Sequence, residues 1–350
     1  MKGCIKVSIV LVLTVILILP LVPDGWAAPA EGKAAADFYK GKTIKWYVPA
    51  KAGGGYDRKT RAFAPYIEKY TGARVIVINK PGGGMMLAPV HVYKAVKPDG
   101  LSLSSVPTLS APSGQLVGKP GMENMDVTKF NWLANIASEP STVFVNSKLP
   151  YKSLAELRKA KELKFGLTGP TGTPAHMARL VMQEALGIDV KPILGIESAP
   201  GVILAVVRGE YDGSCLPPVR FLKFIQQGTV RPLAAVAKER VEEIPNVPTI
   251  YEAVKDMGIG DDAKFWIDRM VAMCELFVTI VTTPGVPKDR VVFLEEAFKK
   301  SSQEPKLLEI GKKEKLNFKY VTGDEVAKEI EAFLKLSPAR KARYTELMKF

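Results

Sequence analysis

Residues 43–61 read TIKWYVPAKAGGGYDRKTR, and they contain the unit from which the rest of the chain is built. Thr43–Val48 is predicted to be a strand, which Pro49 and the glycine-rich loop after it bring to an end. From Asp57 to Tyr70, apolar and aromatic residues recur at helical spacing, so a helix is expected there, and Gly72 stops it. Repetition of this strand, loop and helix is typical of an α/β protein.

The same order of elements continues along the chain. Arg74–Asn79, with four successive β-branched residues, is predicted to be a strand. Pro81–Gly84 then opens a helix to about Ala95, and the turn Lys97–Gly100 leads into a strand at 101–106. Later strands are predicted at 165–168, 190–193, 212–216, 230–236, 275–282 and 317–321, with helices between them. Because no long linker interrupts this alternation, we expect two lobes that share the chain by crossing between them.

The composition is that of a globular protein. The length of 350 residues suggests two domains, and 47% hydrophobic with 24% charged residues excludes collagen-like and disordered classes. The net charge of +13 raises a nucleic-acid hypothesis, but acidic residues are interleaved with the basic ones and no ladder of aromatic and basic residues occurs. We therefore expect no nucleic-acid partner and assign the charge to attraction of small anions. Two histidines and no CxxC pair exclude a three-histidine zinc site and a zinc cluster.

The N-terminal segment is organised like a secretory signal peptide. A short basic front precedes an apolar run over residues 7–19, which as a helix of about 20 Å is too short to cross a hydrocarbon core of about 30 Å. The small residues Gly25 and Ala27 suit a signal-peptidase site, so we expect cleavage of residues 1–27 after Ala27 and a periplasmic mature protein. A retained membrane anchor is the alternative, because Leu21 and Val22 extend the apolar run.

Three glycine-rich turns stand between a strand and a helix and are the strongest candidates for a ligand site. They are Ala52–Asp57, Pro81–Gly84 and Gly169–Thr173. Backbone N–H groups in such turns approach a ligand closely, and the following helix adds the positive end of its dipole. The turns also follow the carboxyl ends of strands, where open α/β sheets bind ligands. The alternative is that the glycines only permit tight turns, and neither nucleotide-phosphate motif is present.

No catalytic constellation stands out. Ser110 and Ser113 lie in no G-x-S-x-G elbow, and no spacing singles out a carboxylate pair. His176, at the start of a predicted helix, suits a helix cap or a pocket wall better than a general base. We therefore expect a protein that is not an enzyme and has no cofactor and no metal site. A secreted hydrolase is the alternative, and turnover on an ester or amide panel would reveal it.

Six motifs occur in an order found in one family of solute receptors. They are TIKWYVPAKAGGGYDRKTR (43–61), VIVINKPGGGM (75–85), KPDGLSL (97–103), LTGPTGTPAHMA (167–178), VRGEYD (207–212) and GTVRPLAAVAKERVEEIPNVPTIYEA (228–253). From about Phe38 to Leu334 the chain resembles the Bug (TctC-like) family of periplasmic solute receptors, the binding components of tripartite tricarboxylate transporters. Each motif is weak alone, but their common order makes the resemblance specific.

The resemblance implies the α/β fold of a class II periplasmic binding protein, a Venus flytrap whose two lobes are hinged around a central cleft. Lobe 1 would comprise residues 38–142 and 238–350, and lobe 2 residues 143–237. The family resemblance further implies a monomer that captures a small carboxylate and delivers it to the permease subunits of a tripartite tricarboxylate-type transporter. An exported sensor that partners a membrane histidine kinase is the alternative.

The resemblance also implies where the ligand lies. The family typically holds a carboxylate between the loop after the first strand and the helix N-terminus after the glycine loop of the second lobe. Carried over to this chain, the ligand-binding residues are Lys51, Ala52, Gly53, Gly54, Gly55, Tyr56, Asp57, Gly83, Gly84, Thr108, Gly169, Thr171, Gly172, Thr173, His176 and Asp212. Two opposed helix N-termini suit a dicarboxylate or another ligand with two acceptor ends.

The chain departs from the family pattern at several places that bear on specificity. Lys51 stands where the family usually has a small or apolar residue, and Tyr56 replaces a small hydroxyl residue. The stretch Pro192–Gly195 lacks the usual tyrosine, and the segment 253–275 is longer and more charged than in relatives. Lys51 either adds a cation at the mouth of the pocket or is an ordinary solvated lysine. The identity of the ligand stays open.

Two cysteines follow the N-terminal apolar run, and their pairing bears on hinge motion. Cys215 is expected at the end of a lobe-2 strand and Cys274 in lobe 1. Because a bridge between lobes would restrain closure, we predict that both are free thiols, although an oxidising compartment permits a disulfide.

Overall fold

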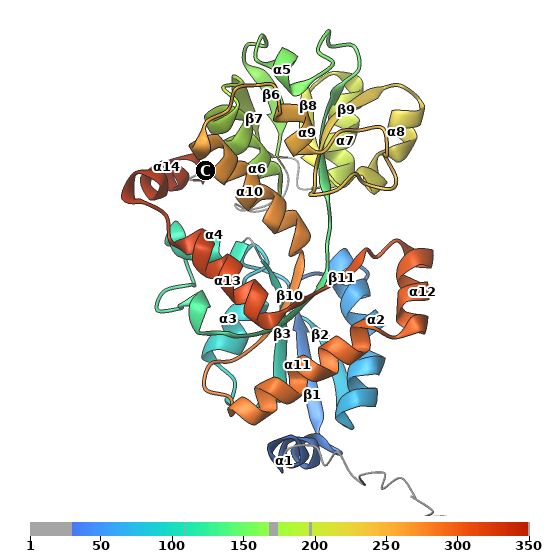
Figure 1. Ribbon diagram of the computed structural model, residues 1–350, viewed down its shortest axis with the longest axis vertical. Coiled ribbons are helices and arrows are strands. Elements are labelled where there is room, and N and C mark those ends of the chain that lie inside the picture. Colours follow the sequence, from blue (N-terminus) through green and yellow to red (C-terminus); the bar gives the residue numbers. More distant parts are fainter. Residues whose placement is uncertain (1–29, 109, 168–173, 196–197, 349–350) are drawn as a thin grey trace, which may run out of the picture.

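The computed structural model describes residues 30–108, 110–167, 174–195 and 198–348. Its strands form two separate sheets, and each sheet is the centre of one lobe (Figure 1). We call the lobe around the six-stranded sheet the first lobe and that around the five-stranded sheet the second lobe. The predicted signal segment 1–27 lies outside the described residues.

The two sheets differ in their strand directions. The first contains β1 (Thr43–Val48), β2 (Arg74–Asn79), β3 (Ser102–Pro107), β4 (Asn131–Ala137), β10 (Val278–Thr282) and β11 (Phe318–Thr322), in the order β11-β4-β10-β3-β1-β2. The second contains β5 (Ser141–Asn146), β6 (Leu163–Gly166), β7 (Val190–Ile193), β8 (Gly213–Leu216) and β9 (Val230–Val236), in the order β7-β6-β8-β5-β9. In the first sheet β1, β2 and β3 are parallel, whereas β10 is antiparallel to both β3 and β4.

Helices cover both faces of the first sheet, as the alternating pattern predicts. One face carries α1 (Ala30–Tyr39), α2 (Gly55–Thr71), α11 (Lys288–Ser302) and α12 (Pro305–Glu314). The opposite face carries α3 (Leu87–Lys94), α4 (Ser110–Leu116) and α13 (Gly323–Leu334). Each face has its own apolar cluster, so the first sheet separates two cores.

Helices also cover the second sheet. One face packs against α6 (Pro174–Leu180), α9 (Ile250–Val254), α10 (Asp261–Glu275) and α14 (Pro338–Met348). The other face packs against α7 (Ala199–Arg208), and α8 (Leu222–Gln226) lies on the same side. The short helix α5 (Leu154–Leu157) completes the lobe. Within the described part of the chain, no helix combines the length and the apolar character needed to cross a membrane.

The carboxyl edges of the two sheets face each other. Since β10 is antiparallel to β3 and β4, strands β1, β3 and β4 end at the same edge of the first sheet. In the second sheet β6 and β8 end at the edge where the antiparallel β5 begins. Only residues 138–140 join the end of β4 to the start of β5, a span of about 10 Å. The carboxyl ends of β1, β3, β6 and β8 therefore face the same region between the lobes.

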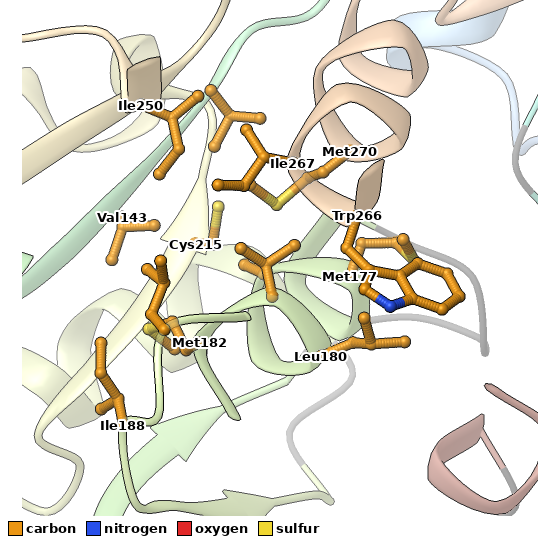
Figure 2. Packing of buried hydrophobic residues seen from close by; sticks show 14 of the residues in the cluster. Val143, Met177, Leu180, Met182, Ile188, Cys215, Ile250, Trp266, Ile267 and Met270 are labelled. Carbon is orange, nitrogen blue, oxygen red and sulfur yellow. The ribbon is translucent and has the colours of Figure 1, made fainter. Parts of the chain in front are cut away.

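Cys215 and Cys274 are both buried and both free, which confirms the predicted thiol state. The expected separation of the two cysteines into different lobes is wrong, because both belong to one apolar cluster on the second sheet. Figure 2 shows the reason: Ile267 of α10 lies toward the strand that carries Cys215, and Trp266 of the same helix lies beside Met177 of α6. This apolar face of α10 is buried against the second sheet, although its sequence segment was expected in lobe 1.

Candidate functional site

The loop between β1 and α2 ends in an exposed helix N-terminus. The N-cap of α2 is Gly54, which has no side chain to accept a hydrogen bond. The first backbone N–H groups of the helix are therefore not capped by the N-cap residue. Gly53 adopts a φ of +78°, which favours glycine at this turn. Lys51, Ala52, Gly53 and Gly55 are exposed. The geometry offers an anion both backbone donors and the positive end of the α2 dipole.

Asp57 holds this loop in place rather than facing outward. Its carboxylate is buried and accepts hydrogen bonds from the Gly53 N–H at 2.8 Å, from Arg61 Nε at 2.9 Å and from Asn79 Nδ2 at 2.8 Å. Burial acts to raise the pKa of Asp57, but these hydrogen bonds and the charge of Arg61 keep the pKa below its ordinary value. The ionised carboxylate therefore fixes the conformation of the loop.

Tyr56 links the same loop to residues 276–277, where the chain crosses between the lobes for a second time. Its side chain is buried, its hydroxyl donates to the Phe277 carbonyl oxygen at 2.9 Å, and the two rings lie 4.8 Å apart. Phe277 lies between α10 and β10, where the chain returns from the second lobe to the first sheet. Tyr56 thus anchors α2 to the hinge region.

The loop after β2 lies beside the loop after β1. Asn79, the last residue of β2, donates from Nδ2 to the Ala50 carbonyl oxygen at 3.0 Å as well as to Asp57. Gly83 and Gly84 follow with φ angles of +56° and +59°. The structure therefore brings the predicted residues of these two loops to one edge of the first sheet.

Thr108 lies at the same edge but points toward the helices. It follows β3, is buried, and donates its hydroxyl to Thr279 Oγ1 at 3.1 Å. It also lines a cavity of about 20 Å³ with Arg269 and Met273 of α10 and Glu329 of α13. Thr108 thus lies where α10 of the second lobe meets the first.

The second lobe contributes less to the described site. His176 lies in the first turn of α6 and is buried. Gly169, Thr171, Gly172 and Thr173 lie outside the described residues. Asp212 precedes β8, at the edge opposite to the one that faces the first lobe, and its carboxylate accepts the Lys164 N–H at 2.7 Å. The structure therefore does not bring Asp212 together with the loops after β1 and β2.

Sequence reasoning missed a charged cluster at the connection between β4 and β5. Glu139 Oε1 lies 3.7 Å from Lys59 Nζ of α2 and 3.4 Å from the Arg220 guanidinium. Arg220 is the last residue of the 3-10 helix η3 (Pro218–Arg220), which follows β8. Lys59 and Arg220 each lie 80 or more positions from Glu139 in the sequence, so no local sequence pattern could have indicated this cluster.

Comparison with known proteins places this geometry in a family. Residues 60–337 match the family model described as tripartite tricarboxylate transporter family receptor. Over 309 residues the chain is 27% identical to a UPF0065 protein from the TAR-I ttuE-ttuC' intergenic region of Agrobacterium vitis, covering 85% of this chain and 80% of that protein.

Solved structures give the same fold. A TctC solute binding protein from Polaromonas superposes with a TM-score of 0.67 at 22% identity, covering 89% of this chain and 99% of that chain. MatC from Rhodopseudomonas palustris, which contains bound malate, superposes with a TM-score of 0.61 at 18% identity, covering 88% and 99%. The two-lobed α/β fold of periplasmic binding proteins is thereby confirmed. Since the family model spans most of the chain, this protein belongs to the family of tripartite tricarboxylate transporter receptors, as the order of its motifs indicated.

Proposed function

We propose that this protein is a periplasmic receptor that captures a small di- or tricarboxylate between its lobes and delivers it to a tripartite tricarboxylate-type permease. The observation that carries the proposal is the N-terminus of α2, which lacks a side-chain cap and is held by Asp57 at the edge that faces the second lobe. Bound malate in MatC, a protein of the same fold, supports a carboxylate ligand.

Within this proposal the residues of the β1–α2 loop have different roles. The backbone of Ala52–Gly55 receives one carboxylate, while Tyr56 and Asp57 hold the loop from behind. The loop Gly169–Thr173 and the start of α6 at His176 receive the ligand from the second lobe. Asp212 has no ligand contact, because it lies at the far edge of the second sheet. The contribution of Lys51 at the mouth stays a prediction.

The proposal extends to the location and the moving parts of the protein. Residues 1–27 act as a signal peptide, and the mature receptor works in the periplasm as a monomer. For the lobe division we propose strands β5–β9 with helices α5–α10 and α14 as one moving body, because these helices pack around the second sheet. The remaining strands and helices form the other body.

Calorimetric titration with malate, adipate and citrate tests the function, with matched variants at two glycines. Gly53 and Gly41 have φ angles of +78° and +72°, and neither has an atom within 4 Å of an added Cβ. Gly53→Ala and Gly41→Ala therefore impose a similar backbone strain of about 1 kcal/mol. Only Gly53→Ala is expected to weaken carboxylate binding, because Gly41 precedes β1 at its opposite end.

The outcomes separate clearly. A saturating carboxylate at about 100 times its Kd should stabilise the wild-type protein by about 2.7 kcal/mol in thermal unfolding. Absence of binding to every carboxylate, or equal affinities of the two glycine variants, contradicts the proposed site.

A further inference from the structure

The connection between β4 and β5 places one carboxylate between cations from both lobes. Glu139 belongs to this connection and is tied to α10 through its N–H, which donates to the Cys274 carbonyl oxygen at 2.9 Å. Lys59 approaches from α2 of the first lobe, and Arg220 approaches from the end of β8 in the second lobe. Glu139 therefore pairs with a cation from each lobe at the point where the lobes are joined.

The two cations lie close to the edges that carry the proposed site. Lys59 is four residues after Gly55, so it lies one helical turn below the N-terminus of α2 on the same face. Arg220 follows the carboxyl end of β8, the edge of the second sheet that faces the first lobe. Both cations are thus within the region between the facing edges.

Lys59 and Arg220 differ in how accessible they are. The side chain of Lys59 is 5% exposed, and its ammonium lies 4.8 Å from the centre of the Phe277 ring. Glu139 is 14% exposed, whereas Arg220 is 43% exposed. Lys59 is therefore fixed beside Glu139 as its buried partner, and only the guanidinium of Arg220 can turn toward a second anion.

The cluster carries a net positive charge. Two cations share one carboxylate, and burial of Lys59 without Glu139 would cost several kcal/mol, so that ion pair persists. The Arg220–Glu139 contact of 3.4 Å is slightly shorter than the Lys59–Glu139 contact of 3.7 Å, but it is far more exposed to solvent, and an arginine forms bidentate pairs with carboxylates. The Arg220 guanidinium can therefore leave Glu139 and pair with an incoming carboxylate, while Lys59 keeps its ion pair with Glu139.

We propose that Arg220 is a specificity residue that binds the second carboxylate of a dicarboxylate whose first carboxylate lies at the N-terminus of α2. In this structure Glu139 pairs with the Arg220 guanidinium, and on binding a carboxylate of the ligand takes the place of Glu139 there. This inference rests on the proposed carboxylate-receptor function. The inference goes beyond that function, because it assigns the selection of the ligand to a charged side chain as well as to backbone donors.

Two substitutions with opposite expected effects test the inference. Arg220→Gln removes the guanidinium and should weaken binding of malate, adipate or citrate about tenfold or more, with less than twofold change for the monocarboxylates lactate and hexanoate. Glu139→Gln removes the competing charge and should tighten binding of the same di- and tricarboxylates. Because it also leaves the buried Lys59 ammonium without its carboxylate, this variant should melt at a lower temperature than the wild type, and its affinity is measured well below that temperature. Arg220→Lys, which keeps the charge but loses the fork of donors, should fall between wild type and Arg220→Gln.

Arg208→Gln is the matched control, since Arg208 is an exposed arginine of the second lobe that pairs with Glu210 at the end of α7. Equal affinities of the Arg220→Gln and Arg208→Gln variants for a di- or tricarboxylate that the wild type binds overturn the role of Arg220 alone. Failure of the wild type to bind any of the three acids overturns the proposed function and this inference together. Because Arg220 is exposed, its variants are expected to keep the wild-type melting temperature, which thermal unfolding checks.

Discussion

Asp57 shows how a single buried carboxylate can fix the conformation of a glycine-rich loop, here the loop that we propose as part of the ligand site. Three donors converge on it: Gly53 belongs to the loop after β1, Asn79 is the last residue of β2, and Arg61 lies in α2. The sequence motif predicted Asp57 as a ligand contact, because a carboxylate in a glycine-rich loop has the same local pattern in either role. Only the folded chain shows that Asn79 and Arg61 already occupy it.

Asp57→Asn tests this role at the level of one atom. The amide retains one oxygen for Arg61 and Asn79, but its NH₂ group then faces the Gly53 N–H, which loses its acceptor. We expect a loss of about 1–3 kcal/mol in the free energy of unfolding and weaker carboxylate binding. Chemical denaturation and calorimetric titration measure the two effects.

Asp212→Asn is the control for that variant, since Asp212 also accepts a backbone N–H but lies at the far edge of the second sheet. It should lose stability and keep the wild-type affinity. Equal affinity loss in both variants would mean that general destabilisation, not loop geometry, weakens binding.

At the scale of elements, strands with a strong local signal were predicted to the residue. Thr43–Val48, Arg74–Asn79, Val190–Ile193 and Val230–Val236 coincide with β1, β2, β7 and β9. Their ends are marked by proline, glycine or charged residues, which act locally. The start of α13 is marked just as locally, by a capping box between Thr322 and Glu325, three residues apart.

Elements whose signal depends on distant partners were missed. β4 and β5 are buried along nearly their whole length and show no alternation, so their sequences did not indicate strands. The segment of α10 contains enough charge that it was interpreted as a family departure, yet its apolar face covers the second sheet. The charged cluster of Glu139 was missed for the same reason, because its partners come from both lobes.

Glu295 of α11 is partly buried near the start of α13, and its pKa is raised as a result. Burial, and secondly the nearby charge of Asp324, raise the pKa of Glu295 from 4.5 to about 7. The folded protein thus binds this proton more tightly than the unfolded chain does. As pH rises from about 4.5 to about 7 the unfolded chain ionises first, so this group makes the protein less stable over that window.

Glu295→Gln should therefore raise the melting temperature at pH 8 and leave it unchanged near pH 4.5. The amide has the shape of the protonated acid but cannot ionise. Glu296→Gln, at the exposed neighbouring position, is the control and should change the melting temperature little at either pH. A pH-independent effect of Glu295→Gln would contradict the raised pKa.

For the whole molecule, the path of the chain determines which motions are possible. The chain crosses between the lobes at residues 138–140, at 276–277 and again at 335–337 between α13 and α14. α13 packs on the first sheet, whereas Tyr344 and Leu347 of α14 belong to the core of the second. The C-terminal helices α13 and α14 thus join the lobes a third time (Figure 1).

One buried hydrogen bond links this third crossing to the first lobe. The Tyr344 hydroxyl donates to Ser113 Oγ of α4 at 2.7 Å, both side chains are fully buried, and the Tyr344 ring stacks on Trp266 of α10. Tyr344→Phe keeps the stacking and removes only the donor. We expect a loss of about 1 kcal/mol in the free energy of unfolding and a larger radius of gyration of the ligand-free protein in small-angle scattering, because the bond favours this arrangement of the lobes.

Tyr39→Phe provides a control within one lobe. The Tyr39 hydroxyl is also buried and donates to the Gly100 carbonyl oxygen at 3.2 Å, but both residues belong to the first lobe. Its loss should lower stability by a similar amount without changing the scattering profile. If both variants scatter like the wild type while losing stability, the Tyr344–Ser113 bond only adds to folding. If Tyr344→Phe alone expands the molecule, the C-terminal helix sets how far the lobes open before a ligand arrives.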